Sequence, residues 1–392
     1  MPLNLERARQ LMQKAGVDAI VAASPANVFY VSDYYTEGVH LGCGTQSYAL
    51  LPLDGEPAII APRSEADLVI QSGSWIKDIH FYGCLNVKAS KIDQSSDITK
   101  KIAEAVGGDA KVTSCDSLVI AVTSRGFSGK KIAFDSSGVN PIRFDNVKKN
   151  LPDAKILDGS RLLSDIRAVK SSTEVGLIER ATEITEKSME DALEIAQPEI
   201  MEIDMAGMFS YSIAEDGGRV SHEYIGFGER SAYPNPVPTA LQAVKGNLIR
   251  MKLGATLKRY HGNVVRTALL GGASSEVERR LKSVIDAQEA AFDIMKPGTK
   301  MSVVFMAIQK ELAKAGLKEC SSSLGHCIGI DCYEWPWITS NEDAEVEEGM
   351  VLNISSPYLD LGWGGIELED TVQVTKKGVK LLTNTERTLY LL

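Results

Sequence analysis

Apolar side chains recur at two spacings in the first part of the chain, and each spacing predicts one kind of element. They fall at helical intervals over residues 4–15 and again near 98–106. Short apolar runs bounded by turn residues predict strands at 17–22, 47–51, 58–61, 131–134 and 155–157. Alternating helices and short strands predict a compact α/β domain in this part of the chain.

The pattern changes at about residues 150–170. A turn is predicted at 150–153, and a long helix from about Ser172 to Ile195, with Ser172 as its candidate amino-terminal cap. We place a domain boundary near residue 160, which divides the chain into domains 1–160 and 161–392. In the second domain we expect helices at about 201–215, 274–295 and 302–315, and strand-rich blocks at 219–270 and from 319 onward.

Composition and net charge limit the class of protein and the kinds of binding partner that can be expected. The 392 residues are 44% hydrophobic and 24% charged, which is ordinary for a globular protein of two domains. The chain has 42 Lys and Arg residues and 52 Asp and Glu residues, which gives a net charge of −10. It has no run of basic residues long enough to bind along a phosphate backbone, so nucleic acid is not expected as a partner. No apolar run approaches the ~20 residues of a membrane span.

The amino terminus and the cysteines bear on location. Charged residues interrupt every apolar stretch among the first 24 residues, so no signal-peptide core is predicted. Six cysteines without a C-x-x-C pair are far too few for a disulfide scaffold. We therefore expect a reduced, cytoplasmic protein.

Four blocks in the second half combine glycines with residue types that carry chemistry. They lie at 246–255, 259–267, 324–336 and 348–372, and the first two predict a β-hairpin. In order and spacing the blocks resemble the signature of the creatinase, prolidase and aminopeptidase P superfamily. The segments that resemble the opening of its first domain and the entry to its catalytic domain are 16–21, 24–30 and 167–171. The resemblance covers nearly the whole chain and implies an α/β amino-terminal domain followed by a pita-bread catalytic domain.

The resemblance also assigns positions to the five side chains that bind two metal ions in peptidases of the superfamily. Lys252 and Asn263 stand at the two Asp positions, and Ser355 stands at one Glu position. His326 and Glu369 match the remaining His and Glu. Because a lysine ammonium repels a divalent cation and has no lone pair to offer it, we expect neither a dinuclear metal centre nor another cofactor.

Creatinase, the metal-independent relative, opens a C–N bond with His and Glu residues, and the resemblance to it is partial. Its catalytic His falls at Pro234, and the Glu before its Arg-Thr pair falls at Val265. The two arginines that bind creatine fall at Gln46 and Trp337, so creatine itself is not expected as the substrate.

The residues that remain suggest a catalytic group of His326, Glu369, Lys252 and Asn263. In this hypothesis His326 or Glu369 activates water, or Glu369 attacks directly, while Lys252 and Asn263 stabilise the developing oxyanion. A Ser-Lys nucleophilic pair of Ser355 and Lys252 is an alternative. A second alternative is structural, with Glu369 and Lys252 forming a buried ion pair in the former metal space.

Residues expected to contact the substrate are Ser355, Tyr333, His261 and Trp337. Tyr333 stands where peptidase relatives carry another His, and large aromatic side chains supply apolar area at binding sites. His222, His261 and Tyr333 also have a structural interpretation that needs no ligand.

Three functions remain open, with a small molecule or short peptide as the partner. The first is a metal-independent, creatinase-like hydrolase of a C–N bond in a small amide, amidine or cyclic substrate. The second is a non-catalytic pita-bread protein that binds a peptide or small ligand, and the third is a metal-dependent Xaa-Pro dipeptidase or aminopeptidase. The resemblance further implies a homodimer whose first domains close over the partner's site, with His40, Gln46 and Arg63 as residues to inspect.

Overall fold

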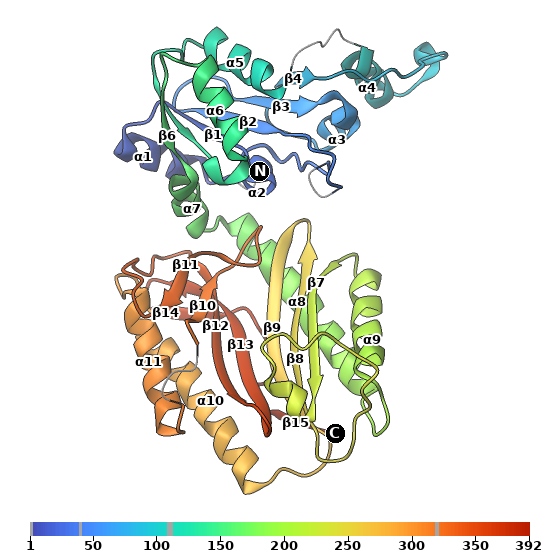
Figure 1. Ribbon diagram of the computed structural model, residues 1–392, viewed down its shortest axis with the longest axis vertical. Coiled ribbons are helices and arrows are strands. Elements are labelled where there is room, and N and C mark those ends of the chain that lie inside the picture. Colours follow the sequence, from blue (N-terminus) through green and yellow to red (C-terminus); the bar gives the residue numbers. More distant parts are fainter. Residues whose placement is uncertain (1–2, 39–40, 108–112, 318–320) are drawn as a thin grey trace. The chain divides into compact units, whose positions relative to one another are not determined.

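The computed structural model describes residues 3–38, 41–107, 113–317 and 321–392, which form two compact units (Figure 1). Unit 1 is Met1–Arg167 and unit 2 is Ala168–Leu392. The division follows Arg167 rather than residue 160 because helix α7 (Ser160–Ala168) is fastened to unit 1. The Arg7 guanidinium donates to the Asp165 carbonyl at 3.0 and 2.9 Å, and Arg167 donates to Asn27 Oδ1 at 2.9 Å.

Unit 1 is built on a mixed six-stranded sheet of order β4-β3-β2-β1-β5-β6. Its strands are β1 (Ala19–Ala22), β2 (Tyr48–Pro52), β3 (Ala58–Pro62), β4 (Asp78–Tyr82), β5 (Lys131–Phe134) and β6 (Lys155–Asp158). Its helices before α7 are α1 (Leu5–Ala15), α2 (Pro25–Ser32), α3 (Ala66–Gln71), α4 (Asp97–Gly107), α5 (Ser114–Ser124) and α6 (Pro141–Asn150). The α/β prediction for this part of the chain is confirmed.

Unit 2 carries a nine-stranded sheet whose main path runs β11-β10-β12-β13-β9-β8-β7, with antiparallel neighbours throughout that path. These strands are β7 (Arg219–Phe227), β8 (Leu248–Leu257), β9 (Tyr260–Leu269), β10 (Ser323–Cys327), β11 (Glu334–Thr339), β12 (Val351–Asp360) and β13 (Gly364–Thr375). Strand β14 (Gly378–Leu381) pairs with β13, and β15 (Leu389–Leu391) pairs with β9.

Helices cover one face of this sheet, as Figure 1 shows. Helices α8 (Ser172–Glu194) and α9 (Glu202–Glu215) pack on strands β7–β9, and α10 (Ser275–Ile294) and α11 (Met301–Lys314) pack on β10–β13. The cap of α8 is Ser171 rather than Ser172, because Ser171 Oγ accepts from Glu174 N while the Glu174 carboxylate accepts from Ser171 N. None of the helices in the described ranges is long and apolar enough to cross a membrane.

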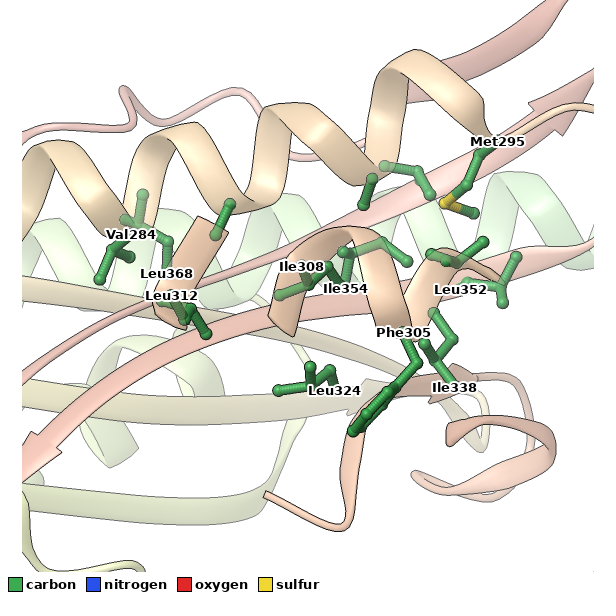
Figure 2. Packing of buried hydrophobic residues seen from close by; sticks show 14 of the residues in the cluster. Val284, Met295, Phe305, Ile308, Leu312, Leu324, Ile338, Leu352, Ile354 and Leu368 are labelled. Carbon is green, nitrogen blue, oxygen red and sulfur yellow. The ribbon is translucent and has the colours of Figure 1, made fainter. Parts of the chain in front are cut away.

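The alternation of side chains along each strand determines which of them face away from the hydrophobic core of unit 2. On β12 and β13, Leu352, Ile354 and Leu368 point into the core beneath α10 and α11, where Val284 and Ile308 pack against the sheet (Figure 2). Because successive strand residues point to opposite faces, the residues between them lie on the face away from the helices. That uncovered face carries the polar residues described next.

Candidate functional site

Three rows of residues cross the uncovered face of the unit 2 sheet, and the strand register places them. The middle row, from β7 to β12, is Tyr224, Lys252, Val265, Glu369 and Ser355. A second row next to it contains Arg250, Thr267, Glu367 and Pro357. The third row contains His222, Gly254, Asn263, Thr371, Asn353 and His326. Residues far apart in the sequence are thus brought together by backbone pairing alone.

A cavity of about 280 Å³ opens over these rows. Its lining combines charged, polar and apolar side chains from several segments of unit 2. The lining residues are Pro234, Asn235, Lys252, Ser321, Ser323, Gly325, His326, Tyr333, Trp337, Ser355, Pro357, Leu359, Glu367 and Glu369. Six of the eight predicted site residues therefore lie at one cavity, and Asn263 and His261 do not.

Lys252 is the cation among the residues that line the cavity. Burial by itself lowers the pKa of an ammonium group, but Glu367, Glu369 and Tyr333 more than compensate, so the pKa of Lys252 is raised. Lys252 is therefore fully charged near neutral pH. A Ser-Lys nucleophilic pair needs a neutral lysine, so the alternative that paired Lys252 with Ser355 is disfavoured.

Glu367 and Glu369, two residues apart on β13, differ in charge state. Glu367 is bonded to the Arg250 guanidinium and accepts the Ser355 hydroxyl at 2.9 Å. Burial alone would raise its pKa, but Arg250 and Lys252 hold the pKa below its usual value. Burial raises the pKa of Glu369 to about 7, with Lys252 opposing the rise and Glu367 adding to it. Glu369 is thus the carboxyl group that exchanges its proton near neutral pH.

His326 is neutral, and the structure defines its tautomer. Its Nδ1 lies 2.9 Å from the Cys327 carbonyl, which only accepts hydrogen bonds, so Nδ1 carries the proton and Nε2 has the free lone pair. Burial lowers the pKa of His326 to about 4, and the Lys252 charge contributes to the decrease. At neutral pH the Nε2 atom of His326 is available to accept a hydrogen bond, and the ring does not supply a proton.

Two stacked aromatic rings form one wall of the cavity. Tyr333 and Trp337 lie parallel within 5°, with ring centroids 5.5 Å apart. The imidazole of His326 lies 4.3 Å from the Tyr333 ring and 5.5 Å from the Trp337 ring. Tyr333 remains 45% exposed, so this wall offers apolar area to a ligand.

Asn263, His222 and His261 lie outside the cavity lining. Asn263 Nδ2 donates to Cys332 Sγ at 3.2 Å, and His261 Nδ1 lies 2.9 Å from Ser221 Oγ. Burial lowers the pKa of His222 to about 3. We therefore leave Asn263 and His261 out of the site proposed below, because their side chains do not line the space that a ligand would occupy.

The donors at the five superfamily positions do not fit a pair of divalent cations. Lys252 places a positive charge where the resemblance expects a carboxylate, Asn263 donates to a thiol, and the Ser355 hydroxyl donates to Glu367. Hard divalent cations require several oxygen ligands, mostly carboxylates. Within the described ranges, no three His, Cys, Asp or Glu side chains are arranged to hold a metal ion.

Sequence patterns missed several residues of the site. Arg250 and Glu367 form a buried ion pair beside Lys252, and Asn353 Nδ2 donates to Glu369 Oε1 at 3.3 Å. The alternation of Glu367 and Glu369 on one strand was the available signal, because residues two apart share a face. Asn353 faces Glu369 because the β12–β13 hairpin pairs Asn353 with Thr371 and Ser355 with Glu369, and this register is not set by the periodicity of either strand alone.

The unit 1 residues singled out for a contribution to a partner's site have local roles. Gln46 Nε2 donates to the Ala23 carbonyl at 2.8 Å, and Arg63 donates to the carbonyls of Gly83 and Ala105. His40 lies outside the described residues. Gln46 and Arg63 are both buried within unit 1.

Comparisons with known proteins agree with this architecture. Residues 4–169 match the creatinase/prolidase N-terminal domain, and residues 176–376 match metallopeptidase family M24. An Xaa-Pro dipeptidase of Pyrococcus horikoshii is 26% identical over 387 residues, which cover 97% of this chain and 96% of that protein.

Solved structures extend the likeness in fold. A dipeptidase from Pyrococcus horikoshii superposes with a TM-score of 0.81 at 23% identity, covering 99% of each chain. The N-terminal domain of the FACT complex subunit SPT16 from chickpea has a TM-score of 0.69 at 17% identity, covering 99% of this chain and 98% of that one. The architecture therefore occurs in a dipeptidase and in a subunit of the FACT complex. Together with the family match over more than half of its length, these observations show that the chain belongs to metallopeptidase family M24, a family of hydrolases that act on C–N bonds, and has the creatinase/prolidase amino-terminal domain and the pita-bread fold.

Proposed function

We propose that unit 2 hydrolyses the C–N bond of a short peptide without a divalent cation. The observation that carries the proposal is that Glu369 and Lys252 line the same cavity and interact electrostatically there. A carboxyl group that titrates near neutral pH is well matched to general base catalysis, and the adjacent ammonium supplies the positive charge that a metal provides elsewhere in the family.

Glu369, Lys252 and His326 have different roles in the proposed reaction. Ionised Glu369 removes a proton from water as the water oxygen attacks the carbonyl carbon, and Lys252 stabilises the tetrahedral oxyanion. Glu369 then returns that proton to the leaving nitrogen as the C–N bond breaks, which yields a carboxylic acid and an amine. His326 accepts a hydrogen bond through Nε2 and orients the water or the substrate.

The relatives favour a peptide over a small amide as the substrate, because they are named Xaa-Pro dipeptidases. In this respect the third function considered from the sequence fits the comparisons better than the creatinase-like one. The comparisons do not support metal independence, which rests on the donor chemistry at Lys252, Asn263 and Ser355 alone. Binding of a peptide without cleavage is the competing function, motivated by the same three replacements.

The test is a panel of Xaa-Pro dipeptides assayed with and without a chelator, together with elemental analysis of the dialysed protein. We expect cleavage that is insensitive to chelator and a metal content far below one equivalent. The value of kcat/KM should rise with pH to a plateau, with a midpoint near the Glu369 pKa of about 7, because the ionised carboxylate is the base. The Glu369→Gln variant should remain folded and lose the reaction.

The other outcomes are equally informative. Cleavage abolished by chelator and restored by Mn²⁺ would establish the metal-dependent dipeptidase. Peptide binding without cleavage would establish the binding protein. An unchanged rate in Glu369→Gln would remove Glu369 from the mechanism.

A further inference from the structure

A buried ion pair outside the cavity lining is not used by the proposed reaction. Lys170, between α7 and α8, donates from Nζ to Glu334 Oε2 at 3.1 Å. The two side chains are only 1% and 6% exposed. Burying two charges is expensive unless each is well compensated, so a pair in this position calls for an explanation.

The Glu334 carboxylate also holds a loop. Its Oε1 accepts from the Asp331 backbone N–H at 3.2 Å, inside the segment 328–333 that joins β10 to β11, called here the 328–333 loop. Gly329 of this loop packs directly on the carboxylate, since a Cβ there would lie 2.6 Å from Glu334 Oε1. The Gly329 carbonyl accepts from His261 N at 2.8 Å, which ties the loop to β9.

The last residue of the 328–333 loop is Tyr333, which stands directly before Glu334 in the chain. Its ring lies 4.3 Å from the His326 imidazole, and its hydroxyl interacts with Lys252. The position of the loop therefore determines what His326 and Lys252 encounter on the cavity side.

We propose that Glu334 is a positioning residue of the site, whose carboxylate, anchored by Lys170, holds the 328–333 loop so that Tyr333 lies against His326 and beside Lys252. Only the kinetic part of its test rests on the proposed function. Glu334 does not line the cavity, so it acts through Tyr333 rather than on a ligand.

The test uses a spectroscopic signal that needs no substrate. The chain has five histidines, so protein labelled at histidine Cε1 gives at most five signals, and His326→Gln assigns one of them. Ring currents from Tyr333 and Trp337 displace the His326 signal. In Glu334→Gln we expect this signal to move toward the shift of a histidine without aromatic neighbours.

Glu186 offers a matched control. Like Glu334 it is a buried carboxylate outside the cavity lining that accepts from backbone N–H groups, but these belong to Asn384 and Thr385, both at 2.7 Å, and not to the 328–333 loop. Glu186→Gln should leave the His326 signal in place. If Glu334→Gln does not fold, the His326 signal is measured in the double variant Lys170→Met with Glu334→Met. Two apolar side chains can fill the space of the ion pair, but neither can accept a hydrogen bond from Asp331 N.

The two parts of the test separate the two proposals. If the protein cleaves peptides, Glu334→Gln should lower kcat by on the order of 10²-fold through misplacement of the site, while Glu186→Gln stays within about twofold. If it cleaves none, the proposed function fails and the His326 signal still decides this inference. An unmoved signal in the folded Glu334 variants would overturn it.

Discussion

Lys252 changes the electrostatics of the site through a single side chain. In the superfamily pattern this position supplies negative charge to hold cations, whereas here it supplies positive charge to carboxylates. Burial and Glu367 push the pKa of Glu369 upward, and Lys252 opposes them. The value of about 7 is therefore a balance that one substitution can shift.

Lys252→Met should raise the pKa of Glu369 above about 7, because the opposing positive charge is gone while burial and Glu367 remain. The pH profile of kcat/KM would then move to higher pH, and the maximal rate would fall because the oxyanion loses its cation. Lys245→Met, at an exposed position, is the control and should leave the profile unchanged. If the midpoint of the pH profile stays near pH 7 in Lys252→Met, Lys252 does not control the pKa of Glu369.

Motif positions predicted part of the cavity lining, and the strand geometry supplied the rest, including the charged residue Glu367. Lys252, His326 and Glu369 follow from the resemblance, and all three line one cavity. Asn263 occupies an equally well matched motif position but lies beneath the 328–333 loop, bonded to Cys332. A sequence motif predicts the strand on which a residue lies and the face to which it points. It does not predict whether a loop covers that face, because this depends on tertiary packing.

At the scale of elements, a single glycine sets how closely α8 approaches the sheet. A Cβ at Gly262 of β9 would lie 2.2 Å from Thr182 N and 2.3 Å from the Ala181 carbonyl carbon, both in the backbone of α8. A side chain in that space would have to displace the helix, because backbone atoms cannot rotate away.

Gly262→Ala should therefore destabilise unit 2 by about 1–3 kcal/mol or more, the usual cost of overpacking. Gly176→Ala is the matched control on α8 itself, where a Cβ would meet nothing within 4 Å. That change should instead stabilise by roughly 0.5–1 kcal/mol, because alanine restricts the unfolded chain. Thermal unfolding of both variants measures the difference, and equal melting temperatures would contradict the close approach.

Elements with a clear pattern of apolar residues were predictable from the sequence, including short strands such as β3 and β5, whereas several helices were not. The long helix α8 and the hairpin of β8 and β9 appear within a few residues of their predicted ranges. Helices α2, α5 and α6 were missed because their apolar side chains are not concentrated on one face, and α3 because its 6 residues make too few turns to establish a period. Helix α7 was missed as well. The order of strands in the sheet was also beyond the sequence, because the pairing of β13 with β9 joins segments that are far apart in the chain.

At the scale of the molecule, every residue that lines the cavity belongs to unit 2. Unit 2 also contains two apolar cores, one beneath α8 and α9 and one beneath α10 and α11. Unit 1 has its own core around β1, β2, β3 and β5. Each unit therefore has what a domain requires in order to fold by itself.

A chain of residues 168–392 should fold cooperatively and show the ring-shifted His326 signal of the whole protein. The first part is measured by thermal unfolding with near-ultraviolet circular dichroism, and the second by the histidine spectrum. The matched fragment 1–167 should give a separate transition. A fragment 168–392 without fixed tertiary structure would show that unit 2 depends on unit 1.

The rows of the unit 2 sheet have a consequence for how such a protein evolves and can be engineered. The strand register that brings positions 252, 355 and 369 together is made by backbone hydrogen bonds, which do not depend on the side chains at those positions. The scaffold can therefore exchange a carboxylate for an ammonium or a hydroxyl while the remaining residues keep their places. We therefore expect substitutions at these few positions to change the chemistry of the site while the sheet stays folded.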